Sequence, residues 1–191
     1  MSDVKNILLV GVGGQGTILV GKILSNGLLA AGFDVKMSEV HGMAQRGGSV
    51  SNQVRYGKEV FSPIIDKGQA DILVAFETME AVRWSPFLKK GGQMVVNDYR
   101  IPSAPILTGQ ADYPEGLLEA LKAKADTTVI KAGDMAEALG NPKAMNIVLF
   151  GALVKKMQLS DIDWPSQIRD NVKPAFVDLN LKAFQAGQAA V

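Results

Sequence analysis

The segment Asn6–Gly16, NILLVGVGGQG, decides the fold class of this 191-residue chain. Its first five residues, with four apolar side chains in succession from Ile7 to Val10, are typical of a buried strand, and GVGGQG follows directly. In the GxGxxG pattern the first glycine permits a tight turn, the second a close approach of backbone to ligand, and the third close packing of helix on sheet. Free N–H groups at the start of the following helix favour an anion such as a phosphate. The segment therefore predicts a Rossmann-like strand, turn and helix.

This turn supplies the first group of candidate cofactor-binding residues. They are Gly11, Gly13, Gly14, Gln15 and Gly16. An alternative interpretation is that the glycines only permit the turn and contact no ligand. The sequence alone leaves both interpretations open.

Beyond this segment, apolar strand-like runs alternate with helical stretches, which is typical of a mainly parallel sheet with helices on both faces. Further strands are predicted at about 35–39, 70–76, 93–97 and 127–131. Helices are predicted at about 15–31 (capped by Gly32), 78–88 and 114–125, and over the C-terminal third. A Gly91-Gly92 turn and a long connection at 98–112 join these elements. We therefore expect one α/β, three-layer, Rossmann-like domain that covers residues 1–191.

The stretch SVSNQVRY, which follows the second strand, alternates weakly between apolar and polar residues. Such alternation is typical of a half-exposed strand, and Gly57 then provides a turn before EVFS. This part of the chain predicts an antiparallel hairpin added to the sheet.

Composition restricts the classes of function. Twenty Lys and Arg residues against 19 Asp and Glu residues give a net charge of +1, so overall charge does not indicate a nucleic acid or an anionic membrane as partner. The absence of cysteine excludes disulfides, thiolate zinc sites and iron–sulfur clusters held by this chain. No apolar run approaches the roughly 20 residues of a membrane span, and the start lacks a signal-peptide pattern. We expect a cytoplasmic protein without a metal site.

A second glycine-rich segment, HGMAQRGG, occupies positions 41–48 and contains the single histidine. Glycine allows the backbone conformations of an anion-binding nest, and an arginine makes bidentate contacts with phosphate or carboxylate. Arg46, Gly47 and Gly48 are therefore candidate ligand-binding residues, although a glycine-rich turn with an exposed arginine is often only a turn. His41 is a candidate for proton transfer. Since no partner for it is visible, we interpret it as a residue of an interface or of the active-site rim.

Polar residues follow several predicted strands at the edge where open α/β sheets bind ligands. They are Glu39, Thr78, Asn97 and Asp98. We expect them to form one polar rim that faces a ligand or a partner. For Thr78 the alternative is that it caps the following helix, with Glu77 and Glu80 favouring the helix dipole.

Two nucleotide-binding folds share some of these features. Glu39 lies nearly where a dinucleotide-binding fold places the acidic residue that contacts the ribose, but a hairpin follows it instead of a second nucleotide-binding half. An ATP-adenylating fold also has a glycine-rich turn after its first strand. However, the cysteine pairs for zinc and a convincing acidic residue for magnesium are missing.

Taken together, four stretches resemble the gamma-type component of the 2-oxoacid:ferredoxin oxidoreductases. They are VGVGGQGTILVGKIL, SEVHGMAQRGGSVSNQVRYG, SPIIDKGQADILVAFETMEAVRW and GGQMVVND, and the likeness covers almost the whole chain. Within this family His41, Met43 and Gln45 favour the arylpyruvate branch, and the chain is most similar to the small (beta) subunit of indolepyruvate ferredoxin oxidoreductase. His41, Met43 and Gln45 are also assigned to the partner or active-site rim.

The resemblance implies a subunit of an enzyme that oxidatively decarboxylates an aryl-2-oxoacid to the aryl-acetyl-CoA and reduces ferredoxin. Thiamine diphosphate and iron–sulfur clusters then belong to a large partner subunit, which agrees with the absence of cysteine here. The chain is expected to carry no catalytic residue and to be inactive alone. The glycine-rich loop at 41–48 is expected to dock near the partner's active site, where it contacts coenzyme A phosphates or the substrate carboxylate. A stand-alone NAD(P)-binding protein is the alternative.

Overall fold

The computed structural model describes residues 4–41 and 47–191, and for His41 the backbone only. One mixed sheet contains six strands: β1 (Lys5–Val12), β2 (Asp34–His41), β3 (Ser49–Gly57), β4 (Ala70–Ala75), β5 (Leu88–Asn97) and β6 (Asp126–Ile130). Their order is β2-β3-β1-β4-β5-β6. Strands β1, β4, β5 and β6 are parallel, whereas β3 is antiparallel to both β1 and β2. The predicted mainly parallel sheet with an antiparallel hairpin is confirmed.

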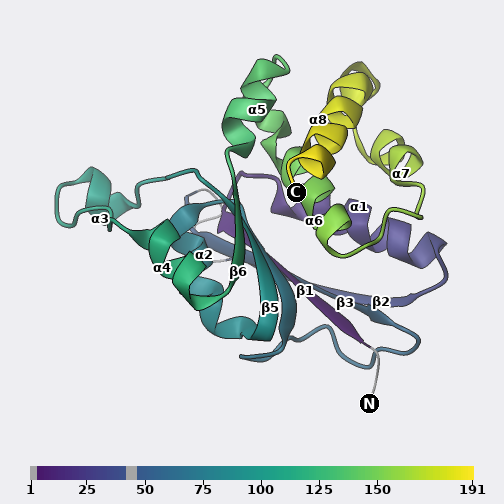
Figure 1. Ribbon diagram of the computed structural model, residues 1–191. Helices are drawn as coiled ribbons and strands as arrows, with labels where there is room; N and C mark the ends of the chain where they lie inside the picture. Colours follow the sequence, from purple (N-terminus) through teal and green to yellow (C-terminus); the bar gives the residue numbers. More distant parts are fainter. Residues whose placement is uncertain (1–3, 42–46) are drawn as a thin grey trace.

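Helices cover both faces of this sheet (Figure 1). They are α1 (Thr17–Ala30), α2 (Thr78–Trp84), α3 (Ala104–Leu107), α4 (Leu117–Lys124), α5 (Ala132–Ala138), α6 (Met145–Lys156), α7 (Trp164–Asn171) and α8 (Val177–Ala189). Short 3-10 turns lie at Ser85–Phe87, Pro142–Ala144 and Pro174–Phe176. Helices α1, α5, α6, α7 and α8 lie on one face, and α2 and α4 lie on the other. The expected three layers and the helical C-terminal third are present. No helix in the described ranges is both long and apolar enough to cross a membrane.

Two apolar clusters hold the layers together because β1 alternates its side chains between the two faces. Ile7 and Leu9 point into the larger cluster, under α1, α6 and α8, while Leu8 and Val10 point into the smaller one, under α2 and α4. All four side chains are fully buried. The central strand is therefore continuously apolar, as a strand covered on both faces should be.

Helices α6 and α8 approach each other closely through two glycines. A Cβ atom at Gly151 would lie 2.1 Å from the Phe184 carbonyl oxygen, and one at Gly187 would lie 1.8 Å from the Val148 carbonyl oxygen. Because backbone occupies the space that any side chain would need, only glycine fits at these positions.

The expectation of a half-exposed β3 is wrong. This strand lies between β1 and β2, inside the sheet, and most of it is buried, including the polar residues Ser51, Asn52 and Gln53. Helix α1 covers one face of β3, and the loop 58–69 crosses the other, where Gln53 accepts a hydrogen bond from the Ile65 N–H at 2.6 Å. The EVFS stretch belongs to this loop and is not a strand, so β2 is the hairpin partner of β3.

Two further boundaries differ from the prediction. Helix α2 ends at Trp84 rather than Leu88, because Pro86 lacks the N–H that a continuing helix requires, and a 3-10 turn follows. Gly91 and Gly92 lie inside β5, where the pairing with β4 changes register. The end of α1 is as predicted: Gly32 has a φ of 88°, and the Phe33 N–H donates to the Leu28 carbonyl, as in a Schellman motif.

Candidate functional site

The carboxyl ends of β1, β4 and β5 meet at one edge of the sheet. The chain leaves β1 through α1 on one face and leaves β4 through α2 on the other face. A crevice between neighbouring strands whose connections diverge in this way is the usual ligand site of an open α/β sheet. The GVGGQG segment lies at this point.

Within that segment, Gly11 and Gly16 have structural roles that differ from those the motif suggests. Gly11 does not turn the chain but still belongs to β1, and a Cβ there would lie 2.8 Å from Gln15 Oε1. The turn is made by Val12 to Gln15, where the Gln15 N–H donates to the Val12 carbonyl at 3.2 Å and Gly14 has a φ of 102°. Gly16, with a φ of 82°, packs against α6 and not against the sheet.

Gln15 fastens this turn to the end of β4. Its Oε1 accepts from the Val12 N–H at 2.8 Å, and its Nε2 donates to the Phe76 carbonyl at 2.8 Å. The side chain is buried. Gln15 therefore positions the glycine turn, and both ends of its amide are already engaged within the chain.

The two glycine-rich segments predicted from the sequence lie side by side. The Gly13 N–H donates to the Gly48 carbonyl at 2.9 Å, and the Gly47 N–H donates to the Gly13 carbonyl at 3.4 Å. Gly47 has a φ of 81°, which glycine adopts without strain. Gly42, Met43, Gln45 and Arg46 lie outside the described residues, as does the side chain of His41.

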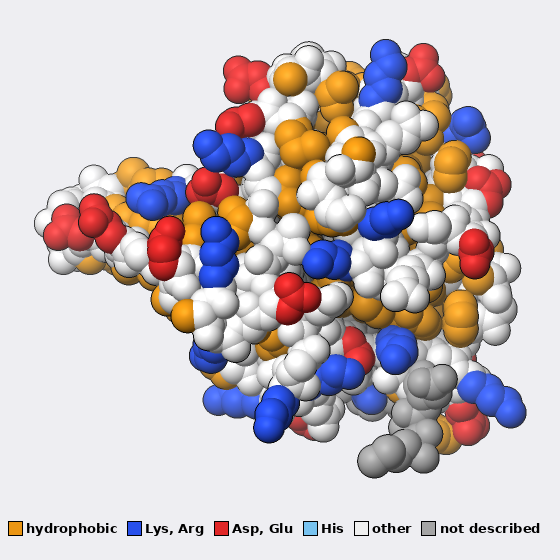
Figure 2. All heavy atoms as spheres, viewed as in Figure 1, with side chains coloured by type: hydrophobic (Ala, Val, Ile, Leu, Met, Phe, Trp, Pro, Cys, Tyr) orange, Lys and Arg blue, Asp and Glu red, His pale blue; other side chains and the backbone are white. Residues whose placement is uncertain are grey.

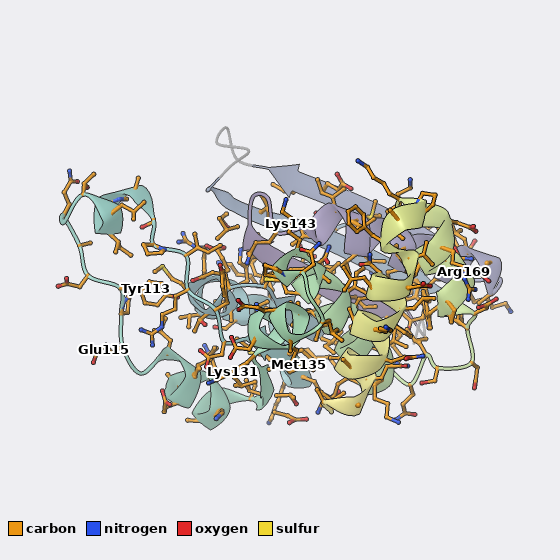
Figure 3. All side chains as sticks on the ribbon, turned by 90° about the horizontal axis from the view of Figure 1, so that it is seen from above. Tyr113, Glu115, Lys131, Met135, Lys143 and Arg169 are labelled. Carbon is orange, nitrogen blue, oxygen red and sulfur yellow. The ribbon has the colours of Figure 1, made fainter. Side chains whose placement is uncertain are left out.

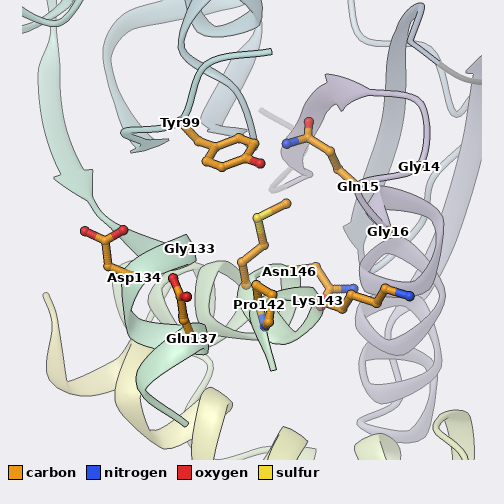
Figure 4. Close-up of a pocket in the computed structure, with 11 residues that line it drawn as sticks. Gly14, Gln15, Gly16, Tyr99, Gly133, Asp134, Glu137, Pro142, Lys143 and Asn146 are labelled. Carbon is orange, nitrogen blue, oxygen red and sulfur yellow. The ribbon is translucent and has the colours of Figure 1, made fainter. Parts of the chain in front are cut away.

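A cavity of about 630 Å³ opens beside the glycine turn (Figure 4). One wall is the turn and the start of α1, and the other walls come from the segment after β5, from α5 and from the start of α6. The lining residues are Gly14, Gln15, Gly16, Tyr99, Gly133, Asp134, Glu137, Pro142, Lys143, Met145 and Asn146. Sequence reasoning found the first wall and missed the others, because no local motif marks residues 133–146.

The wall nearest α1 is suited to an anion. Helix α1 starts without a side-chain cap among the described residues, so the N–H groups of its first turn remain available. Asn146 is buried and its Oδ1 accepts from the Ile147 N–H at 2.9 Å, whereas its Nδ2 has no partner in the described parts of the chain. A Cβ at Gly16 would lie 2.4 Å from that Nδ2. An amide donor without a partner in the described residues thus lines the cavity beside the start of a helix.

The remaining walls of the cavity differ in charge. Lys143 lies on the same side as Asn146, whereas Asp134 and Glu137 project from α5 across the cavity, below the Tyr99 ring. The Tyr99 ring packs on Gly133, where a Cβ would lie 3.6 Å from the ring. The cavity therefore combines an anion-binding end, an aromatic wall and a hydrogen-bond-accepting end, which suits a ligand that has both phosphate and polar organic parts.

The predicted polar rim is only partly assembled. Asn97 is fully buried, where its Nδ2 donates to the Phe76 carbonyl at 3.2 Å and its Oδ1 accepts from the Ala132 N–H at 3.0 Å. Asp98 follows Asn97 and is half-buried, and its N–H donates a hydrogen bond to the Ile130 carbonyl. Glu39 lies on β2, and strands β3, β1 and β4 separate it from β5. It is not adjacent to β1, where a dinucleotide-binding fold would need it.

Helix α2 is capped by Glu77 and not by Thr78. The Glu77 carboxylate accepts from the Glu80 N–H at 2.9 Å, while the buried Thr78 hydroxyl lies 3.2 Å from the carbonyl oxygens of Asn97 and Tyr99. Glu77 also accepts from the Tyr113 hydroxyl at 2.5 Å. Burial and this neighbouring carboxylate raise the pKa of Tyr113 well above its ordinary value.

A second buried carboxylate links α2 to the end of the second glycine-rich segment. The Ser49 hydroxyl donates to Glu80, whose other oxygen accepts from Arg83 Nε at 3.1 Å. Trp84 Nε1 donates to Ser49 Oγ at 3.3 Å. Both glycine-rich segments are therefore fixed to the body of the domain at residues next to them.

Comparison with known proteins gives consistent matches over nearly the whole chain. The family described as pyruvate ferredoxin/flavodoxin oxidoreductase matches residues 6–190. An indolepyruvate oxidoreductase subunit IorB from Pyrococcus horikoshii is 38% identical over 97% of this chain and 95% of that protein. A 2-oxoglutarate synthase subunit KorC from Methanothermobacter thermautotrophicus is 28% identical over 98% of this chain and 95% of that protein.

The fold is also found in a solved structure. The gamma subunit of a keto/oxoacid ferredoxin oxidoreductase from Geobacter sulfurreducens superposes on this chain with a TM-score of 0.72 at 26% sequence identity. The superposition covers 97% of each chain. The arrangement of strands and helices around the glycine turn thus occurs in a related subunit.

Proposed function

The chain belongs to the pyruvate ferredoxin/flavodoxin oxidoreductase family, and on this basis we propose that it is a companion subunit of an arylpyruvate ferredoxin oxidoreductase. The complete enzyme oxidatively decarboxylates a substrate such as indolepyruvate, forms the aryl-acetyl-CoA and passes electrons to ferredoxin. This chain contributes no catalytic side chain and is inactive alone. The observation that carries the proposal is the match to IorB over 95% of that protein's length.

The choice of substrate class has two supports. The chain is 38% identical to an indolepyruvate oxidoreductase subunit and 28% identical to a 2-oxoglutarate synthase subunit. In addition, His41, Met43 and Gln45 give the second glycine-rich segment the form typical of the arylpyruvate branch. An aryl-2-oxoacid is therefore the substrate class that we propose.

The cofactors of the reaction are assigned to a larger partner subunit. The sequence has no cysteine that could ligate an iron–sulfur cluster. Within the described residues, no group of three or more His, Asp or Glu side chains is arranged to hold a metal ion. We accordingly place thiamine diphosphate and the iron–sulfur clusters on that partner.

Coenzyme A is the ligand that we propose for the cavity beside the glycine turn. When bound, coenzyme A supplies the thiol that accepts the acyl group. The start of α1, the unpartnered Asn146 Nδ2 and Lys143 fit one of its phosphate groups. Gly13 is hydrogen-bonded to Gly47 and Gly48, and Arg46 directly precedes Gly47 in the sequence. We propose that it adds a charge-assisted contact with a phosphate or with the substrate carboxylate.

Co-expression with the proposed large subunit from the same organism tests the function. The tagged chain is purified under anaerobic conditions, and the eluate is assayed for CoA-dependent reduction of ferredoxin with indolepyruvate, phenylpyruvate, pyruvate and 2-oxoglutarate. We expect an iron–sulfur partner to co-purify and arylpyruvates to be the best substrates. A chain that purifies alone and binds NAD(P) tightly would refute the assignment.

The coenzyme A site is tested in the assembled enzyme. Replacing Lys143 with alanine should raise the KM for coenzyme A by about tenfold, the usual effect of removing one charged contact, and leave the KM for the oxoacid unchanged. Arg46→Ala should raise either the KM for coenzyme A or the KM for the oxoacid. Lys58→Ala, at an exposed position beyond the opposite edge of the sheet, is the matched control and should change neither. If the Lys143 variant has the same KM for coenzyme A as the Lys58 variant, the cavity is not the coenzyme A site.

A further inference from the structure

A projecting arm, residues 101–116, connects β5 to α4 (Figure 1). It extends away from the body of the domain, and Figure 2 shows it as a separate projection. None of its residues is buried, and Leu107, in α3, exposes 74% of its surface. The arm therefore contributes little to the apolar core of its own domain.

Although it is exposed, the arm has a defined shape. At its tip the N–H of Leu107 donates to the Ser103 carbonyl at 2.9 Å, and that of Gln110 donates to the Pro105 carbonyl at 2.8 Å. The Thr108 hydroxyl donates to the Ala104 carbonyl at 3.0 Å. These local bonds fold the tip around α3 without help from the rest of the chain.

Both ends of the arm are fastened to the buried Glu77 carboxylate. Its Oε1 accepts from the Ile101 N–H at 3.2 Å and from the Tyr113 hydroxyl, which in turn accepts from the Met79 N–H at 3.1 Å. The Arg100 guanidinium lies 5.1 Å from the centre of the Tyr113 ring. Anchored at its base and folded at its tip, the arm presents its tip in a fixed direction.

The chemistry of the arm restricts what it can bind. Ile106 and Leu107 supply an apolar tip, while Asp112 and Glu115 supply two negative charges. Residues 101–116 contain no lysine or arginine, and Arg100 lies against Tyr113 at the base of the arm. Figure 3 shows Tyr113 turned toward the body and Glu115 on the outer side of the arm. An apolar pocket with a basic rim is the complementary surface.

We propose that the arm docks on the large subunit of the oxidoreductase, with Leu107 in an apolar pocket whose rim carries lysine or arginine. This inference rests on the proposed function, which supplies the partner. The arm begins two residues after Tyr99, which lines the cavity at the glycine turn. A partner that covers this edge of the sheet therefore contacts the arm as well. This contact fixes the orientation of the partner over the cavity.

The test is a competition during assembly of the complete enzyme. The large subunit is co-expressed with equal amounts of two differently tagged small subunits, one wild-type and one Leu107→Ala, and their ratio is measured in the purified complex. We expect about one variant for every ten wild-type subunits or fewer, the effect of truncating an interface anchor. Phe61→Ala is the matched control, because Phe61 exposes 86% of its surface in the loop 58–69, beyond the opposite edge of the sheet. It should be incorporated at a ratio near one.

A charge-reversed variant tests the basic rim. Asp112→Lys combined with Glu115→Lys should be incorporated poorly at low salt, and the deficit should shrink in 0.5 M salt, where the Debye length is only about 4 Å. The isolated variants should have melting temperatures within about 2 °C of the wild type, because the changed side chains are exposed.

The outcomes separate the two proposals. If the wild-type chain does not assemble with the large subunit, the proposed function fails. If it assembles and Leu107→Ala is incorporated equally well, the proposed function stands and the docking arm is refuted. Self-association of the isolated chain is measured by sedimentation. If Leu107→Ala abolishes self-association and is still incorporated as well as the wild type, the arm binds a second copy of this chain, and docking on the large subunit is refuted.

Discussion

Replacing Gln15 with methionine should destabilise the domain, because this amide joins the glycine turn to β4. The variant keeps the approximate volume of the side chain but leaves the buried Val12 N–H without an acceptor. A buried N–H without a partner costs about 1–3 kcal/mol, and losing the bond to the Phe76 carbonyl adds about 1 kcal/mol. The second cost is small because Asn97 Nδ2 still donates to the same carbonyl at 3.2 Å. The expected loss is about 2–4 kcal/mol in the free energy of unfolding.

Urea denaturation of the isolated chain, followed by circular dichroism, measures this loss. The midpoint should fall while the slope with urea stays unchanged, since the surface exposed on unfolding is the same. Gln110→Met, at an exposed position, is the matched control and should stay within about 0.5 kcal/mol of the wild type. If Gln15→Met also stayed within that range, Gln15 would not anchor the turn, and its side chain would be free for a ligand.

Three further predictions concern other parts of the fold. Gly187→Ala should cost about 3 kcal/mol in urea denaturation, because its Cβ meets the Val148 carbonyl and forces α6 and α8 apart. In a titration followed at 295 nm, the phenol of Tyr113 should stay protonated at the pH where ordinary tyrosines ionise. Because unfolding releases that proton, the free energy of unfolding should fall as the pH rises above about 10. Tyr113→Phe should remove this fall. Two hydrogen bonds from Ser166 lower the pKa of Asp163, so the ionised carboxylate stabilises the folded state at neutral pH. Asp163→Asn should therefore be less stable than the wild type at neutral pH, and the difference should disappear as the pH falls below about 4.

Local sequence signals predicted much of the fold. The apolar runs at 6–10 and 70–76, the glycine turn and the Gly32 cap lie close to where the structure has them, because each depends on residues that are near in the chain. The position of β3 was not predictable in this way. Its burial results from pairing with β1 about 45 residues away and from the loop that crosses it, and neither leaves a pattern within the strand itself.

The candidate site was predicted in part for the same reason. Two glycine-rich segments were recognised from composition, and the hydrogen bonds between Gly13 and the pair Gly47 and Gly48 show that they share one edge. The other side of the cavity, with Lys143 and Asn146, comes from α6 and the turn before it. Their position depends on how α6 packs against α1, which is a long-range property. Asn97 ends β5 and Thr78 begins α2, but both side chains are buried there.

The insertion of β3 between β1 and β2 has a consequence for how the chain folds. Strand β1 is synthesised before both of its neighbours in the sheet, which are residues 49–57 and 70–75. Until the chain has been made as far as Ala75, the segment from Ile7 to Val10, whose four side chains are fully buried in the finished domain, lacks at least one of its partner strands. Pairing over such separations is slow and leaves an aggregation-prone segment exposed. During synthesis, a central strand of the finished domain is therefore made well before the strands that bury it.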